Sequence, residues 1–291
     1  MPADTVDAEF ERLMAEAEGR PVSGWDFSWL ESRMRTSPLP WDYESAVLHH
    51  ARESPDLLDL GTGGGEWLAA LPYLPPRTVA TEAWEPNVGV ARARLAPLGV
   101  TVVRLEAAPD NAEQEPGEQR GRLPFPAESF HLVACRHEAF VAREVARVLV
   151  AEGCFVTQQV GGDYRDFYRL LGLPLPAPPA RKWNLALAIA QVEGAGLQVA
   201  ASAEGEQTTS FADVGALAWY LKAVPWTVPD VSARELRPRL ADLHARIARD
   251  GPVTVNLPAF YLEAIKPTPD RKEPHAGSDA GSNRERPHPE G

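Results

Sequence analysis

Hydrophobic and polar positions change their period along the chain in a way that predicts alternating strands and helices. Between residues 57 and 160, short apolar or β-branched runs alternate with segments whose apolar residues recur every three or four positions. The predicted strands are DLLDL, TVATEA, VTVVRLEA, FHLVAC and CFVTQQV, and the predicted helices are EWLAALPYL, PNVGVARARLAPLG and EAFVAREVARVLVAEG. Strands separated by helices of this length imply right-handed crossovers and a parallel sheet.

The pattern continues after residue 160 with longer helical segments. We expect helices at WNLALAIAQVEGAG, FADVGALAWYLKAV and ARELRPRLADLHARIARD, and a strand at LQVAASA. The segment VTVNLPAFYLEAIKP is expected to close the sheet as its final strand.

Residues 1–50 have a different pattern, in which an amphipathic helix (DAEFERLMAEAEG) precedes a cluster of aromatic residues. This segment is too short for a core of its own, so its rings must be buried against the main body. One interpretation is a helical lid over a substrate pocket, with Trp25 or Trp29 contacting the substrate. The other is that the rings simply anchor the segment.

Residues 267–291 lack any hydrophobic periodicity and consist mostly of Pro, Gly and charged residues. Such a segment cannot bury enough apolar surface to offset its loss of conformational entropy. We therefore predict a disordered tail, which leaves residues 51–266 as the main domain.

Composition and charge limit the class of protein. The chain has 291 residues, of which 44% are hydrophobic, and a net charge of −12 from 41 acidic and 29 basic residues. This charge, without a cluster of basic residues, disfavours nucleic acid as a partner. No apolar run is long enough to span a membrane, and the N-terminus does not resemble a targeting segment. The two cysteines are expected to be reduced core thiols. The cysteines, the lack of a membrane span and the N-terminus together favour a cytoplasmic protein.

Four glycines in five positions follow the first predicted strand, in the segment LLDLGTGGGEWL. They either form a tight turn or let backbone amides approach a ligand, and their number favours the ligand. A dinucleotide fingerprint would place its third glycine at position 66, which is Glu66, and that carboxylate would repel a pyrophosphate. No P-loop motif is present. Asp59, two residues before the first glycine, is compatible with a positively charged ligand.

Glu82 ends the second predicted strand, about 20 residues after the glycines. An acid at this place accepts hydrogen bonds from the two hydroxyls of an adenosine ribose. The alternative is a surface acid that caps the following helix, but the pairing with the glycine loop favours the ribose role.

These motifs resemble those of class I S-adenosylmethionine (SAM)-dependent methyltransferases. The resembling segments are LLDLGTGGG with the strand-ending acid, RLPFPAESFHLVAC, REVARVLVAEGCFV and VEGAGLQV, which extend over residues 57–199. The resemblance is strongest to the type-eleven, ubiquinone-methyltransferase-like branch. It implies an α/β, Rossmann-like three-layer sandwich with a seven-stranded sheet, six strands parallel and the last antiparallel. His131 stands where that family has an acid, and Ala151-Glu152 replaces its Lys-Pro.

The resemblance also implies a set of SAM-binding residues. The glycine loop and Asp59 would line the methionine end of SAM, and Glu82 would hold the ribose. Asp110 and Asn111 would contact the adenine, although a plain Asx-turn explains these two residues equally well. The full set is Asp59, Gly61, Thr62, Gly63, Gly65, Glu82, Ala83, Asp110, Asn111 and Arg136.

The implied reaction is the direct displacement of a methyl group from a sulfonium, in which the enzyme mainly aligns the reacting atoms. A base is needed only if the acceptor must lose a proton. His137 and Glu138 are the candidate catalytic residues, and the ordinary pKa of histidine suits this role. The alternative is a polar helix start. Gln158 is a candidate substrate-binding residue.

The sequence thus predicts a SAM-dependent methyltransferase that acts on a small-molecule acceptor without a metal, as a monomer or homodimer. Two alternatives stay open: an RNA (rRNA) methyltransferase and a SAM-binding protein without catalysis. The fold alone does not name the acceptor.

Overall fold

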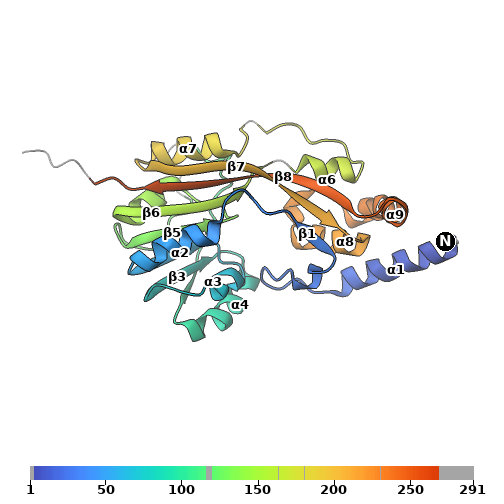
Figure 1. The fold of residues 1–291 in the computed structure, drawn as a ribbon, viewed down its shortest axis with the longest axis horizontal. Coiled ribbons are helices and arrows are strands. Elements are labelled where there is room, and N and C mark those ends of the chain that lie inside the picture. Colours follow the sequence, from blue (N-terminus) through green and yellow to red (C-terminus); the bar gives the residue numbers. More distant parts are fainter. Residues whose placement is uncertain (1–2, 116–119, 163, 180, 230, 269–291) are drawn as a thin grey trace, which may run out of the picture.

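A single eight-stranded sheet organises the chain in the computed structural model, which describes residues 3–115, 120–162, 164–179, 181–229 and 231–268. The strands occur in the order β1-β7-β8-β6-β5-β2-β3-β4 (Figure 1). They are β1 Met34–Thr36, β2 Asp56–Leu60, β3 Arg77–Glu82, β4 Thr101–Arg104, β5 Phe130–Arg136, β6 Leu149–Val160, β7 Gln198–Phe211 and β8 Val253–Ile265. The prediction of seven strands was therefore wrong by one, because β1 adds to the edge of β7.

The strand directions agree with the prediction for the remaining seven strands. Neighbours among β2 to β6 pair in parallel, whereas β8 is antiparallel to both β6 and β7. The short strand β1 is antiparallel to β7. Hydrogen bonding to a strand 170 or more residues away decides the position of β1, and local periodicity carries no sign of such a pairing.

Helices cover both faces of the sheet and complete a three-layer sandwich. They are α1 Ala3–Gly19, α2 Tyr43–Glu53, α3 Glu66–Ala70, α4 Glu85–Leu95, α5 Ala142–Val148, α6 Arg165–Leu170, α7 Leu185–Gly194, α8 Val214–Ala223 and α9 Ala233–Asp250. Buried residues of α2, α3 and α4 share one apolar cluster with the sheet, and those of α5 and α7 share another. The predicted helix over residues 138–153 is only α5, because Leu149 already pairs with Phe130 and starts β6.

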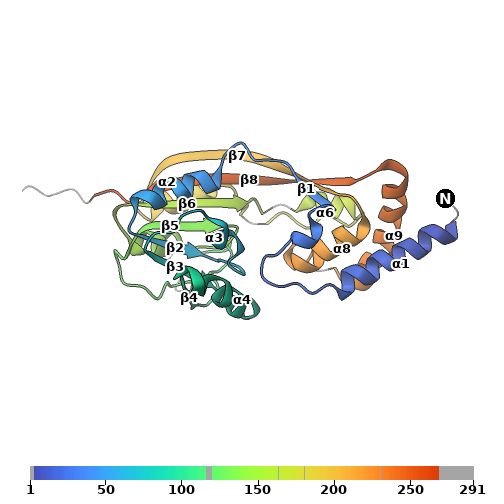
Figure 2. The same ribbon diagram turned by 60° about the horizontal axis from the view of Figure 1, so that its bottom comes forward.

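A second packed body forms where β7 and β8 extend beyond the other strands (Figures 1 and 2). A third apolar cluster joins α1, α6, α8 and α9 to these strand ends, and we call this body the end lobe. Phe10, Leu13 and Met14 of α1 are buried there, as the amphipathic pattern predicted. The predicted boundary at residue 50 falls inside α2, which packs on the sheet.

Residues 269–291 of the predicted disordered tail lie outside the described residues, so its disorder stays a prediction. None of the helices in the described ranges combines the length and the apolar character that a membrane span requires.

Candidate functional site

The glycine loop between β2 and α3 takes a backbone conformation that other residues rarely adopt. Gly61, Gly63 and Gly65 have φ angles of +70°, +62° and +80°. A Cβ atom at Gly61 would clash with Cγ of Glu138, and one at Gly63 would lie 3.2 Å from Cβ of Trp25. The loop thus needs glycine because of its positive φ angles. At Gly61 and Gly63 it also needs glycine because the side chains of Glu138 and Trp25 lie close to where a Cβ atom would be.

A small cleft opens at the carboxyl ends of the central strands, where parallel sheets bind their ligands. Its lining comes from the loops after β2, β3, β4 and β5. The lining residues are Leu60, Gly61, Thr81, Ala83, Leu105, Glu106, Ala108, Gly121, Leu123, Glu138, Ala139, Phe140, Val141 and Val145. Most of them are apolar or present backbone, and the two carboxylates, Glu106 and Glu138, belong to different loops.

Three carboxylates that interact electrostatically are concentrated at this edge of the sheet. Asp59 is buried, and its Oδ2 has no hydrogen-bond partner among the described residues. Burial raises the pKa of Asp59 to about 7, although the Thr62 hydroxyl and the Arg136 guanidinium oppose the shift. Burial and the charge of Glu82 raise the pKa of Glu138 to about 7. Each group disfavours ionisation of its neighbours, so a cation would relieve the repulsion.

Glu82 lies at the end of β3 with one oxygen already engaged. Its Oε1 accepts a hydrogen bond of 2.7 Å from the backbone amide of Trp84. Burial raises the pKa of Glu82, and the backbone amides of Trp84 and Gly63 partly offset this effect. Glu82 therefore borders the glycine loop directly, as the sequence predicted.

His137 and Gln158 contact each other at the ends of β5 and β6. Gln158 accepts a hydrogen bond from Nε1 of Trp41 at 2.8 Å, and its Nε2 lies 3.1 Å from Nε2 of His137. The amide can only donate in this contact, so Nε2 of His137 is the acceptor. His137 is solvent-accessible but enclosed by protein atoms, and this enclosure together with Arg136 lowers its pKa. A lowered pKa and an occupied lone pair would make His137 a weak base, and its catalytic role stays a prediction.

Asp110 and Asn111 have other partners and do not line the cleft. Asp110 accepts a 2.7 Å hydrogen bond from the amide of Ala112, which is the Asx-turn alternative. The buried side chain of Asn111 accepts from the backbone amide of Phe140 at 3.1 Å. Glu106 lines the cleft instead. The strand β4 ends at Arg104, earlier than predicted, and this early end places Glu106 in the loop.

Three further predicted residues lie around the loop. The amide of Thr62 donates to the carbonyl of Thr81 at 2.9 Å, and its buried hydroxyl opposes the rise in the pKa of Asp59. Ala83 lines the cleft after β3. Arg136 ends β5, is exposed and acts electrostatically on Asp59.

The two predicted tryptophans occupy different environments. Trp25 lies against the glycine loop, is 42% exposed and stacks on the exposed Trp226 with ring centroids 6.0 Å apart. Trp29 packs on Trp219 in the end lobe, and the guanidinium of Arg33 lies 4.1 Å from its ring centroid. The structure therefore brings Trp25 to the site and uses Trp29 as an anchor. Trp41 and Trp226 were not among the predicted site residues.

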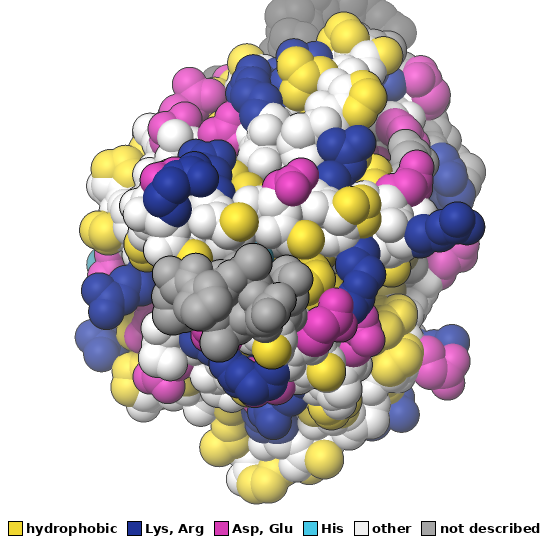
Figure 3. Space-filling view, turned by 90° about the vertical axis from the view of Figure 1, so that its right-hand side faces the viewer, with side chains coloured by type: hydrophobic (Ala, Val, Ile, Leu, Met, Phe, Trp, Pro, Cys, Tyr) yellow, Lys and Arg dark blue, Asp and Glu magenta, His cyan; other side chains and the backbone are white. Residues whose placement is uncertain are grey.

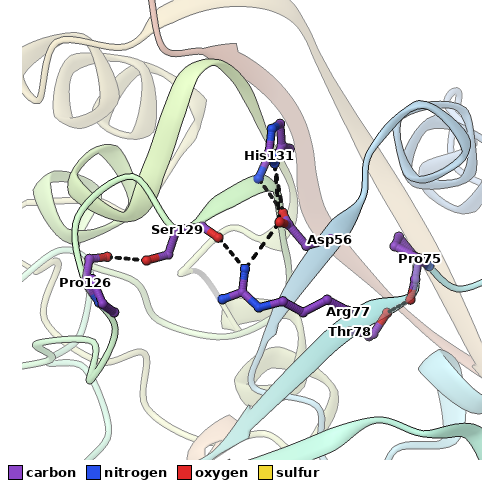
Figure 4. Close-up of polar contacts among 7 residues, drawn as sticks. All are labelled: Asp56, Pro75, Arg77, Thr78, Pro126, Ser129 and His131. Carbon is purple, nitrogen blue, oxygen red and sulfur yellow. Dashed lines mark hydrogen bonds and ion pairs between the residues drawn. The ribbon is translucent and has the colours of Figure 1, made fainter.

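The amino ends of the central strands, opposite the cleft, carry charged side chains that are paired with one another. Asp56, at the start of β2, accepts from the backbone amide of His131 at 2.6 Å, and its Oδ2 lies 3.3 Å from Arg77 (Figure 4). His131 Nδ1 lies 3.2 Å from the same aspartate, and Arg77 also donates to the carbonyl of Ser129. His131, where the resembling family has an acid, is thus part of a network remote from the cleft.

The residues in and beside the cleft have a chemistry compatible with S-adenosylmethionine. Oδ2 of Asp59 has no hydrogen-bond partner in the described chain, and burial together with the charge of Glu82 raises the pKa of Glu138. Glu138 and Trp25 lie against the Cβ sides of Gly61 and Gly63, and the amide of Gly61 donates to Oγ1 of Thr81 at 3.3 Å. A ligand with a positive charge would favour the ionised form of these carboxylates.

Comparisons with solved structures identify the fold. The chain is 21% identical to a protein of Bacillus halodurans provisionally described as a methyltransferase, covering 77% of this chain and 99% of that chain with a TM-score of 0.51. The YcgJ protein of Bacillus subtilis gives 20% identity, 78% and 99% coverage and a TM-score of 0.49. A protein of Galdieria sulphuraria provisionally described as a sarcosine dimethylglycine methyltransferase gives 14%, 89% and 98%, and 0.46.

No protein-family model matches the chain, and no curated protein matches it either. At these identities the structural likeness shows the fold alone. That fold is the class I SAM-dependent methyltransferase fold, which confirms the fold class that the motifs predicted.

Proposed function

From a fold shared with class I SAM-dependent methyltransferases, we propose that this chain transfers a methyl group from SAM to a small-molecule acceptor. The observation that carries the proposal is the group of three carboxylates, Asp59, Glu82 and Glu138, around a glycine loop at the carboxyl ends of the strands. Glycine turns occur in many α/β proteins, but uncompensated acids beside one favour a cationic nucleoside over a phosphate.

Each part of the cleft has a matching part of the cofactor. The glycine loop and Asp59 beside the cleft would hold the methionine end, Glu82 next to them would hold the ribose hydroxyls, and Glu106 in the cleft would accept from the adenine amine. When bound, SAM supplies an activated methyl group that a nucleophile displaces directly from sulfur. The protein contributes alignment of the acceptor and exclusion of water.

The carboxylates should also make the affinity for SAM differ from the affinity for its demethylated product, S-adenosylhomocysteine. Burial, and to a smaller extent the charge of Glu82 acting on Asp59 and Glu138, makes these carboxyl groups resist ionisation. A ligand with a sulfonium charge favours the ionised form of these groups more than a neutral thioether does. We therefore expect tighter binding of SAM than of S-adenosylhomocysteine, which favours product release.

Glu138 is better suited than His137 to accept a proton from the acceptor. It lines the cleft and its pKa of about 7 lets it gain or lose a proton near neutral pH. His137 holds the end of β5 against Gln158 and acts as a positioning residue. Its φ of +60°, rare for a residue other than glycine, agrees with a fixed turn at this point.

The acceptor is proposed to be a small molecule with apolar or aromatic parts. Trp25 lies beside the glycine loop and stacks on the exposed Trp226, and Gln158 lies between Trp41 and His137. RNA is disfavoured by the net charge of −12. Figure 3 shows that Lys and Arg side chains on the face at the end lobe are interspersed with Asp and Glu rather than gathered in one stripe.

The decisive experiment incubates the full-length protein with methyl-labelled SAM and either a small-molecule extract of its own cells or total RNA from them. We expect label in a small molecule, and a loss of about 100-fold in its rate for Glu138→Gln if the acceptor must lose a proton. Label in RNA would overturn the choice of acceptor. Calorimetry that shows SAM binding without any labelled product would instead favour a SAM-binding protein without catalysis.

A further inference from the structure

Three side chains with metal-binding atoms converge on the sheet face that α2 covers. Nε2 of His50 from α2 lies 3.5 Å from Sγ of Cys154 on β6 and 3.4 Å from Oε2 of Glu263 on β8. All three ligand atoms lie within 4.8 Å of one another. Cys154 is buried, with 5% of its surface exposed, so the group forms the floor of a shielded site.

This cluster is separate from the cofactor cleft. Cys154 precedes Gln158 by four residues on β6, which corresponds to about 13 Å along a strand. None of the three residues lines the cleft. The cluster therefore has no part in the site described above.

The arrangement differs from that of a nucleophilic cysteine activated by histidine. In such a triad the carboxylate holds one ring nitrogen while the nucleophile contacts the other. Here the thiol and the carboxylate both approach Nε2 of His50. One nitrogen has a single proton or a single lone pair, so it cannot satisfy both neighbours, whereas a cation between the three atoms can.

The distances suit a small cation with tetrahedral geometry. Bonds of about 2.0–2.3 Å from zinc to N, O and S ligands place neighbouring ligand atoms roughly 3.3–3.7 Å apart. The two distances from Nε2 of His50, 3.4 and 3.5 Å, match those edges. Tyr261 donates its hydroxyl to Oε1 of Glu263, which leaves Oε2 directed at the histidine. Such an outer hydrogen bond is typical of metal ligands.

We propose that His50, Cys154 and Glu263 bind one Zn²⁺ ion, with water in the fourth position. Mixed nitrogen, sulfur and carboxylate ligands suit this ion. The site would tie α2 to β6 and β8 and stabilise the folded chain in proportion to its occupancy. Zinc binds the thiolate form of cysteine, so binding must release the thiol proton and strengthens as pH rises.

Cobalt titration of the full-length, chelator-treated protein tests the site without reference to methyl transfer. We expect one Co²⁺ per chain, thiolate-to-cobalt charge-transfer absorption, visible bands of tetrahedral cobalt, and displacement by Zn²⁺. Cys154→Ser should abolish the charge-transfer band. Cys135→Ser is the matched control because Cys135 is the other buried free cysteine, and it should keep the band.

Further variants separate ligands from their surroundings. His50→Gln and Glu263→Gln should weaken Co²⁺ binding by about 100-fold or more, whereas Tyr261→Phe should weaken it by about 10-fold, as an outer partner does. Thermal midpoints measured without metal verify that each variant is folded. A wild-type protein without the charge-transfer band, or a band that survives Cys154→Ser, would overturn the proposal.

Discussion

The two ends of β2 carry acids in opposite states. Asp56 and Asp59 are three residues apart on one strand and both are buried. Asp56 interacts with the backbone and ring of His131 and with Arg77, as Figure 4 shows. Asp59 keeps an oxygen without a hydrogen-bond partner in the described chain, and its pKa is raised. An aspartate thus links neighbouring strands through hydrogen bonds and an ion pair at one end of β2, whereas the aspartate near the other end keeps an oxygen without a hydrogen bond.

This difference separates stability from function along a single strand. Paired buried charges cost little when every partner is present, and losing one partner destabilises the fold. An unpaired buried carboxylate lowers stability in the free protein, and a cationic ligand recovers that free energy on binding. We infer that Asp59, near the carboxyl end of β2, has an oxygen without a partner in the free protein because a bound ligand supplies that partner.

Gly63→Val should have the largest effect on this edge. It places a β-branched residue at a φ of +62° and a Cβ 3.2 Å from Trp25, so the backbone amides can no longer meet a ligand. We expect the SAM affinity measured by calorimetry to fall by about 100-fold or more, which corresponds to about 3 kcal/mol.

Gly99→Val is the matched control for backbone strain. Gly99 has a φ of +74°, and a Cβ atom placed on it would meet no other atom within 4 Å. It follows the short helical turn after α4 and precedes β4, so it belongs to a different loop from Gly63. This variant should lose stability but keep its affinity. Equal losses of affinity in the two glycine variants would contradict a role of the loop in binding.

Asp59→Asn and Asp56→Asn should change different properties. Asp59→Asn should lower SAM affinity by about 10- to 100-fold, since a hydrogen bond to a charged group contributes about 1.5–3 kcal/mol. It should also raise the thermal midpoint of the unliganded protein by removing an unpaired buried charge. Asp56→Asn should lower the free energy of unfolding by about 1–3 kcal/mol and leave affinity unchanged. Calorimetry and chemical denaturation measure both, and identical behaviour of the two variants would refute the comparison.

A smaller effect is expected from pH. Asp59 and Glu138 have pKa values of about 7 in the folded protein, above their ordinary values of 3.8 and 4.5. Between about pH 4 and 7 the folded chain therefore binds more protons than the unfolded chain, and these two groups make the unfolding free energy fall as pH rises through this window. Ionisation favours a cation, so SAM affinity should rise by up to about 10-fold from pH 6 to pH 7.

The test of the pH effect compares the wild type with Asp59→Asn by denaturation and calorimetry at several pH values. The variant should show a weaker dependence of both quantities. A wild-type affinity for SAM that falls as pH rises over this range would show that the carboxylates do not face the cation.

Local sequence determined the elements whose signals lie within a few residues. Pro86 falls in the first turn of α4, and Gly99 has the left-handed conformation after its end, both as expected. The helix α9 matches its predicted range because Ser232 and Glu235 form a capping box at its start. Glycines after a buried strand indicated the position of the loop for the same reason, since positive φ angles are a local property.

Tertiary structure decided the features that depend on distant partners. The strand β7 extends to Phe211, well beyond its apolar start, because β8 pairs with it along its whole length. Local periodicity predicted neither that extension nor β1. Glu106 lines the cleft because β4 ends early, at Arg104. The side chain of Asn111 instead accepts a hydrogen bond from the amide of Phe140.

The chemistry of the site divides in the same way. Asp59, Glu82 and the glycines could be read from the sequence because they occupy successive strand ends whose place in a parallel sheet is known in advance. The pKa values of His137 and Glu138 could not, because burial and neighbouring charges set them. His50, Cys154 and Glu263 are separated by 104 residues or more along the chain, so only the packing of α2 on β6 and β8 brings them together.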